Sequence, residues 1–234
     1  MDILSLLACF QPLMGATSMR HFSTIVLALL TMPGRITMLS ISRWTEKGGS
    51  YRTIQRFFAT DLPWTELLVK FFQTHLFNPR NEFILAGDAT TITKSGKQTH
   101  GIGLFFREFA RQVVNGLEFF VFSVVDVAKR RAYPLGVRQT VRSGKEKEAI
   151  KERKKKRAKK PKKVKSKRRG RKKGSLNKDK SELNLSPELW RTGELLSGLL
   201  KLVRVFVRIK YVALDQYLRQ LFHKNSHFSV MDTA

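Results

Sequence analysis

Two aspartates occupy equivalent places in the sequence and are the residues best suited to chemistry. Asp88 closes the apolar run 83–87, and Asp215 closes the run 211–214. A carboxylate at the carboxyl end of a strand lies at the rim of a sheet, where open α/β folds bind their ligands. Two such carboxylates could hold Mg²⁺ or Mn²⁺, which prefer oxygen ligands, and such ions support phosphodiester cleavage. The alternative is that each aspartate only caps a turn or helix after its strand.

Four segments around these aspartates share a pattern with a known family. They are Leu85–Thr99 (LAGDATTITKSGKQT), His100–Gly103 (HGIG), Gly116–Phe120 (GLEFF) and Tyr211–Leu218 (YVALDQYL). The segments resemble bacterial insertion-sequence transposases of the DDE class, over roughly residues 80–225. The resemblance implies an RNase H-like fold, in which the strands that bear the two aspartates lie side by side.

The resemblance also implies the roles of the two aspartates. Asp88 and Asp215 would be catalytic metal ligands for Mg²⁺ (or Mn²⁺). The intact activity would be cutting at element ends and transfer of the freed 3′-hydroxyl to target DNA. The family's third acid is a glutamate on a later helix, but no glutamate follows Asp215, and Asp232 is the only later carboxylate. The expectation is therefore a truncated transposase that is inactive alone.

A strongly basic insert separates two parts of this region. The chain carries a net charge of +27, and residues 144–180 hold 21 Lys and Arg against 4 Asp and Glu. Repulsion and the lack of apolar residues predict that this insert is disordered. It contains a run that is similar to an AT-hook, which binds the minor groove of DNA: Arg168, Arg169, Gly170, Arg171, Lys172 and Lys173. The alternative is a polybasic linker that binds only phosphates, with an affinity that falls as salt rises.

The first 80 residues predict helices. Residues 35–44 and 51–59 have helical spacing and are separated by a glycine-containing turn, which fits a helix-turn-helix. In that interpretation Arg52, Gln55 and Arg56 project toward DNA. The alternative is an ordinary helical hairpin with basic surface residues.

The elements after residue 80 follow a different pattern. Strands are expected at 82–88, 117–127, 130–139 and 207–215, with helices at 187–205 and 216–223. We therefore predict an α+β protein. Residues 1–80 would form a helical, helix-turn-helix-like DNA-binding region, and residues 81–234 an incomplete RNase H-like catalytic domain interrupted by the insert. Lys94, just beyond Asp88, would contact phosphates near the scissile bond.

Composition excludes several other classes. The single cysteine, Cys9, rules out an internal disulfide framework, and the scattered histidines and this cysteine form no zinc-ligand spacing. The most apolar run, 22–33, is too short to span a membrane. We expect a bacterial cytoplasmic, nucleoid-associated protein that binds DNA at element ends and at the target. Neither a membrane nor a small-molecule substrate is expected, and the family favours a homo-oligomer on DNA.

Two other functions fit parts of the sequence. A non-catalytic DNA-binding protein, acting as a repressor of transposition, explains the basic insert and the missing glutamate. A basic RNA-associated protein explains the charge but not the paired aspartates.

Overall fold

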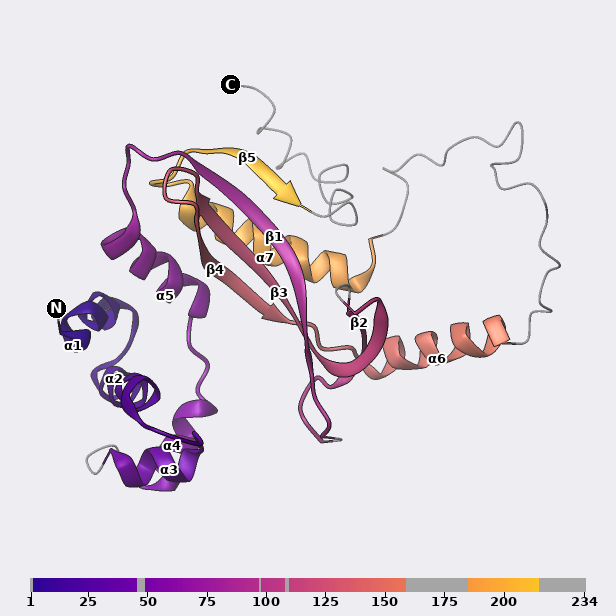
Figure 1. Cartoon of the computed structure of the whole chain (residues 1–234), viewed down its shortest axis with the longest axis horizontal. Helices are drawn as coiled ribbons and strands as arrows, with labels where there is room; N and C mark the ends of the chain where they lie inside the picture. Colours follow the sequence, from indigo (N-terminus) through magenta and orange to yellow (C-terminus); the bar gives the residue numbers. More distant parts are fainter. Residues whose placement is uncertain (1, 46–48, 97, 108–109, 159–184, 215–234) are drawn as a thin grey trace. The chain divides into compact units, whose positions relative to one another are not determined.

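The computed structural model describes residues 2–45, 49–96, 98–107, 110–158 and 185–214. Its helices are α1 (Ile3–Leu7), η1 (Ala8–Leu13), α2 (Ala16–Thr31), α3 (Met38–Trp44), α4 (Tyr51–Phe58), α5 (Trp64–Phe71), η2 (Phe72–Leu76), α6 (Gly144–Ala158) and α7 (Pro187–Val203). Its strands are β1 (Phe83–Thr93), β2 (Gly103–Arg107), β3 (Gln112–Asp126), β4 (Arg131–Gln139) and β5 (Ile209–Leu214). This mixed architecture confirms the predicted α+β class (Figure 1).

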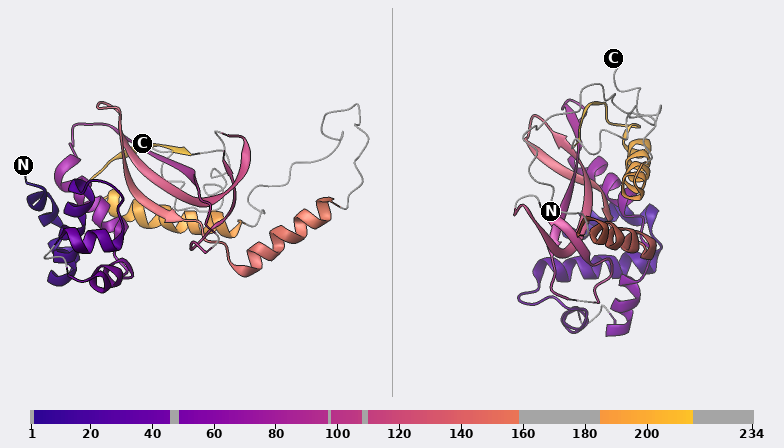
Figure 2. Two further views of the ribbon diagram at one scale, coloured as in Figure 1. Left: turned by 60° about the horizontal axis from the view of Figure 1, so that its bottom comes forward. Right: turned by 90° about the vertical axis from the view of Figure 1, so that its right-hand side faces the viewer.

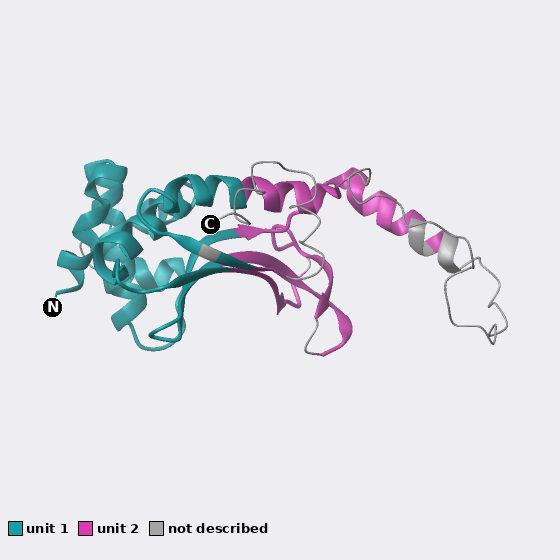
Figure 3. Ribbon diagram, turned by 90° about the horizontal axis from the view of Figure 1, so that it is seen from above, with its two compact units in different colours: residues 1–85, 123–137, 196–212 teal, residues 86–122, 138–195, 213–234 magenta. Residues whose placement is uncertain are grey.

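The chain forms two compact units, which Figure 3 colours separately. The first contains residues 1–85, 123–137 and 196–212, and the second contains residues 86–122, 138–195 and 213–234. No helix within the described residues is long and apolar enough to cross a membrane.

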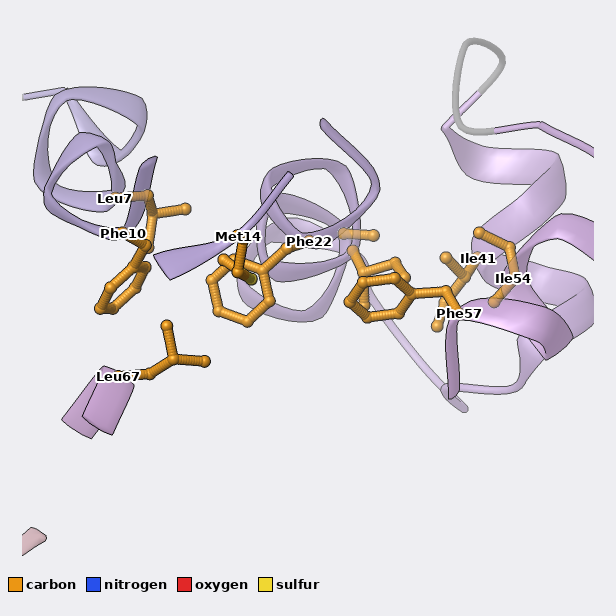
Figure 4. Packing of buried hydrophobic residues seen from close by; sticks show 10 residues of the cluster. Leu7, Phe10, Met14, Phe22, Ile41, Ile54, Phe57 and Leu67 are labelled. Carbon is orange, nitrogen blue, oxygen red and sulfur yellow. The ribbon is translucent and has the colours of Figure 1, made fainter. Parts of the chain in front are cut away.

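The helices of the first unit share one apolar core. Leu7, Phe10 and Phe22 come from the first three of them, and Ile54 and Phe57 come from α4 (Figure 4). The rings of Phe10 and Phe22 meet edge to face with centroids 5.5 Å apart, a favourable geometry for aromatic pairs. The N-terminal segment 1–80 is therefore helical, as the sequence predicts.

The start of α3 differs from the expectation. Residues 35–37 were expected in this helix, but it begins at Met38. Thr37 and Ser40 form a reciprocal capping box, in which the Thr37 hydroxyl accepts from the Ser40 amide at 3.0 Å. This cap fixes the first turn and ends the extended chain that precedes it.

A second aromatic cluster joins the helices of the first unit to its strands. The ring of Phe72, at the end of α5, lies 5.7 Å from that of Phe83 in β1 and 5.3 Å from that of Tyr133 in β4. Phe206, after α7, lies 6.3 Å from Phe72. Phe72 is almost fully buried, so these contacts hold the base of the sheet against α5.

The sheet has five strands in the order β2-β3-β1-β5, with β4 paired to β3. β2 is antiparallel to β3, with Phe106 opposite Val113. β3 is also antiparallel to β1, because the Lys94 amide donates to the Asn115 carbonyl and the Val127 amide donates to the Glu82 carbonyl. β5 runs beside β1 in the same direction (Figure 1). Side-by-side β1 and β5 agree with the RNase H-like arrangement.

Two expectations about the strands are wrong. β1 does not end at Asp88 but continues to Thr93, because its second half, rich in β-branched residues, remains paired with β3. The second difference is β2, which was not predicted. This short strand pairs with Gln112–Gly116, the first residues of β3. Glycines lie at one end of both paired segments, and glycine is uncommon in strands.

The first part of the basic insert is helical rather than disordered. α6 begins with a capping box, in which the Ser143 amide donates to the Glu146 carboxylate at 2.6 Å and the Glu146 amide donates to the Ser143 hydroxyl at 3.3 Å. Arg191 in α7 also donates to Glu146 at 3.0 Å. These bonds fix the start of α6, in which none of the described side chains is fully buried. Residues 159–184 lie outside the described part of the chain.

α7 lies along one face of the strands (Figure 2). It starts with Pro187, which suits the first helical position, and the Leu189 amide donates to the Ser186 hydroxyl at 3.2 Å. Its buried side chains in the first unit are Leu196, Leu199, Leu200 and Val203. In the second unit, Arg138 of β4 donates to the Arg191 carbonyl at 2.9 Å and pairs with Glu194 at 3.3 Å. The helix predicted at 187–205 is thus present, two residues shorter.

Candidate functional site

Asp88 lies in the middle of β1, not at a strand end. Burial alternates along the first half of the strand, with Phe83, Leu85 and Gly87 buried and Asp88 exposed on the opposite face. One carboxylate oxygen of Asp88 accepts from the Ala89 amide at 2.7 Å. An ionised carboxylate has about four acceptor positions, so most of its capacity to bind a ligand remains available.

The residue before Asp88, Gly87, lies close to side chains of both neighbouring strands, β3 and β5. A Cβ on Gly87 would lie 2.6 Å from a ring carbon of Phe122 in β3 and 2.7 Å from a methyl carbon of Leu214 in β5. Glycine is therefore required here for the side chains of both neighbouring strands to close over the backbone. Leu214 is the last residue of β5, and Asp215 follows it outside the described residues.

The register of β1 and β3 defines the face that carries Asp88. The two hydrogen bonds at the ends of this ladder place Lys94 opposite Asn115 and Glu82 opposite Val127. The same register puts Asp88 opposite Val121. Directly opposite residues project to the same face of a sheet. Asp88, Val121, Lys94 and Asn115 therefore lie on one face, and Gly87 and Phe122 on the other.

Lys94 is exposed immediately after β1. Its amide and carbonyl both bond to Asn115, at 3.0 and 3.1 Å, which fixes its backbone. Six residues separate it from Asp88, which corresponds to roughly 20 Å along a strand. The two side chains thus share a face but do not form one contact site.

The helix-turn-helix candidates lie on α4 in the first unit. Arg52, Gln55 and Arg56 are all exposed, whereas Ile54 and Phe57 of the same helix are buried. α4 packs against α3, so these three side chains form the solvent face of a helical pair. The AT-hook-like residues Arg168–Lys173 fall outside the described part of the chain.

Asp126 has a structural role within the first unit. It is completely buried at the end of β3. It accepts from the Asn81 side chain at 2.7 Å and from the Lys129 amide at 3.0 Å. Burial acts to raise the pKa of Asp126, but these bonds and the nearby Lys129 ammonium lower it, and the pKa lies below its ordinary value. The carboxylate thus ties the β3–β4 turn to the chain before β1.

Glu118 is a half-buried carboxylate on the face of β3 that lies opposite to Asp88. Burial raises its pKa, the Thr140 hydroxyl and Arg142 oppose that rise, and Glu188 adds to it. Arg142 itself donates to Glu188 at 2.9 Å, to the Leu104 carbonyl at 2.7 Å, and lies 4.2 Å above the ring of Phe105. These contacts join the start of α7 to β2 and β3.

Gly87 and Arg142 are structurally important residues that were not predicted from the sequence. An isolated glycine inside a strand pattern indicates a close backbone approach, so Gly87 could have been found. No local pattern marks Arg142, because its partners come from β2 and α7.

A family model described as DDE superfamily endonuclease matches residues 7–194. The chain belongs to the DDE superfamily of endonucleases. The predicted resemblance is thereby confirmed at the level of this superfamily, and DNA is the substrate that the superfamily implies. The match covers the helical segment, β1 to β4, α6 and the start of α7, and it stops before β5. Neither a curated protein nor a solved structure matches the chain.

Endonucleases of this superfamily use divalent metal ions, and Asp88 offers the chemistry that such an ion needs. It is an exposed carboxylate on a rigid, centrally placed strand. Within the part of the chain that the structure describes, no three or more His, Cys, Asp or Glu residues gather in a group that could hold a metal ion.

Proposed function

We propose that this endonuclease is the transposase of a bacterial insertion sequence, which cuts DNA at element ends and joins the freed 3′-hydroxyl to a target. The observation that supports this proposal best is the pairing of β1 with β5 beside Asp88. Leu214 lies against Gly87 on one face of the sheet. Since side chains alternate along a strand, the next residue, Asp215, would share the face of Asp88. Asp88 and Asp215 are then the two carboxylates of one site.

This pair of carboxylates would hold Mg²⁺ or Mn²⁺. When bound, such ions activate an attacking oxygen and stabilise the leaving oxygen of a phosphodiester. The chain itself supplies orientation. Asp88 is held by the Ala89 amide and by a strand with paired neighbours on both sides, so its position is fixed before the substrate arrives.

Residues of both units would hold the DNA. We propose that residues 1–80 form a DNA-binding domain, with Arg52, Gln55 and Arg56 on the exposed face of α4. Lys94 and the Arg168–Lys173 run would contact DNA from the catalytic domain, residues 81–234. Lys94 would meet a phosphate roughly six base-pair steps from the scissile bond, given its distance along β1. The enzyme would act as a homo-oligomer on DNA in the bacterial cytoplasm.

The proposal is tested by nicking of a supercoiled plasmid with Mg²⁺, Mn²⁺ or EDTA. Any nicking by the wild-type protein should require one of the two metals. Asp88→Asn should lower the rate at least about 100-fold, because losing a direct ligand should cost no less than losing an outer-shell partner. Asp61→Asn, which changes an exposed carboxylate before α5, is the matched control and should leave the rate unchanged.

Metal-dependent nicking that survives in Asp88→Asn would refute this site. A wild-type protein that binds DNA in a salt-dependent manner, yet nicks none of it with either metal, would instead support a non-catalytic DNA-binding protein.

A further inference from the structure

One exposed surface of the second unit has no role in the proposed function. Four large apolar side chains on β1, β2 and β3 are more than half exposed: Ile92 (53%), Leu104 (51%), Phe106 (57%) and Val113 (58%). Scattered exposed apolar residues need no explanation, but a contiguous set indicates an interaction site. We call these four side chains the apolar row.

The strand registers put the apolar row on one face of the sheet. Phe106 is opposite Val113, and Leu104 is opposite Asn115. Asn115 in turn is opposite Lys94 of β1. Ile92 precedes Lys94 by two residues and so shares its face. The apolar row and Lys94 therefore lie on the face that carries Asp88.

The back of the same ribbon is closed and anchored. Phe105, between two members of the apolar row, is almost fully buried beneath the Arg142 guanidinium. Arg142 bonds to the Leu104 carbonyl and to Glu188 in the first turn of α7. β2 and β3 are thus held rigidly from behind, while the apolar row in front is open to solvent.

Charge identifies the partner. Of the described cations nearby, Lys94 shares the face of the apolar row and Arg111 lies in the turn before β3, whereas Arg107, opposite Gln112, lies on the other face. The net charge of +27 disfavours a second copy of this chain at the apolar row, so the proposed homo-oligomer would form through other surfaces. A polyanion with flat apolar groups fits both features. Unpaired nucleotides are such a partner, because their bases expose π-faces that stack on aromatic side chains while their phosphates meet cations.

We propose that the apolar row binds a single-stranded stretch of the DNA substrate, with a base stacked on Phe106 and a phosphate near Lys94. A base pair inside a duplex offers only its edges to protein, so the row selects strands that are open roughly 20 Å from Asp88 along β1. This inference rests on the proposed function in taking DNA as the substrate and Asp88 as the site of cleavage.

The test compares two ligands of equal charge in EDTA: a thymidylate dodecamer and an abasic dodecamer with the same phosphates. About 0.3 M salt limits phosphate-only binding by the insert. Wild-type protein should prefer the thymidylate strand. Phe106→Ala and Val113→Ser should weaken binding of the thymidylate strand about 5-fold or more and leave the abasic strand unaffected, since stacking depends on bases.

Trp190→Ala is the matched control, because Trp190 on α7 is an aromatic residue with a similar exposure of 58%. It should bind both strands as the wild type does. Thermal melting of each variant checks that it remains folded.

Three results would overturn the inference. The first is that the wild-type protein binds the thymidylate and abasic strands with equal affinity. The second is that Phe106→Ala and Trp190→Ala lose the same amount of affinity for the thymidylate strand. The third is that the wild-type protein is a dimer, which Phe106→Ala converts to a monomer without changing its preference for the thymidylate strand. The last result would show that the row joins two copies. The binding assay contains EDTA and so measures no cleavage. The nicking rate of Asp88→Asn therefore tests only the proposed function, and the strand preference tests only this inference.

Discussion

The close approach of three strands at Gly87 makes one substitution especially informative. In Gly87→Ala the added methyl carbon would lie 2.6 Å from Phe122 and 2.7 Å from Leu214. Apolar carbons pack at about 3.5–4.0 Å, so each neighbour would have to move by about 1 Å. Phe122 is fully buried and has little room to move.

The magnitude follows from two opposing effects. Overpacking a core site costs about 1–3 kcal/mol, whereas replacing a strand glycine by alanine gains about 0.5–1 kcal/mol from the backbone. We expect Gly87→Ala to lower the free energy of unfolding by about 1–2 kcal/mol. The double variant Gly87→Ala/Leu214→Ala shortens the side chain that the new methyl group would meet. Its loss in free energy of unfolding should be smaller than the sum of the losses in the two single variants, because the new methyl group and the Leu214 side chain would compete for the same space.

Urea unfolding, followed by circular dichroism, measures this effect. The matched control is Gly198→Ala in α7, where a Cβ meets nothing within 4 Å. That variant should be as stable as the wild type or more stable by up to about 1 kcal/mol, since alanine favours the helix. Our account of the β1–β3–β5 packing is refuted if Gly87→Ala is as stable as the wild type.

Two further predictions concern charge. Asp126→Asn should lower the free energy of unfolding at neutral pH by about 1–3 kcal/mol, because the carboxylate accepts two bonds in a buried site. Since the folded pKa of Asp126 is lowered, its contribution is present above the ordinary pKa of about 3.9 and is lost as pH falls below it. Unfolding at pH 7 and pH 3 should show the gap closing, and a gap of constant size would contradict this role. Arg52→Gln/Arg56→Gln should reduce the slope of log affinity for duplex DNA against log salt by up to about 1.8, or 0.9 per lost phosphate contact, and an unchanged slope would remove α4 from the DNA interface.

The sequence predicted those parts of the fold that local patterns determine. Hydrophobic spacing located α4 and α7, and the Phe- and Val-rich run located β3, because period and composition are properties of a single segment. The family match confirms the class of enzyme that the segment around Asp88 indicated. The roles of Asp88, Asp215 and the DNA-binding residues stay predictions.

Features that depend on distant partners could not be predicted. β1 continues past Asp88 because the second half of β1 pairs with β3. No local sequence pattern within β1 predicts that pairing. α6 forms in a segment of poor amphipathicity because Arg191, far along the chain, bonds to Glu146. In the first turns of this helix, the bond from Arg191 to Glu146 outweighs the repulsion between neighbouring charges.

The composition of α6 links its own stability to what it meets in solution. Its described apolar side chains, Ala149 and Ile150, are not fully buried, and a lone helix of this length is marginal in water. Its acids, Glu146, Glu148 and Glu152, precede most of its bases, which suits the helix dipole, but Lys147, Lys151 and Lys155 follow one another at four-residue intervals and repel. A polyanion laid along these lysines relieves that repulsion. Binding of such a polyanion and formation of the helix would therefore each favour the other.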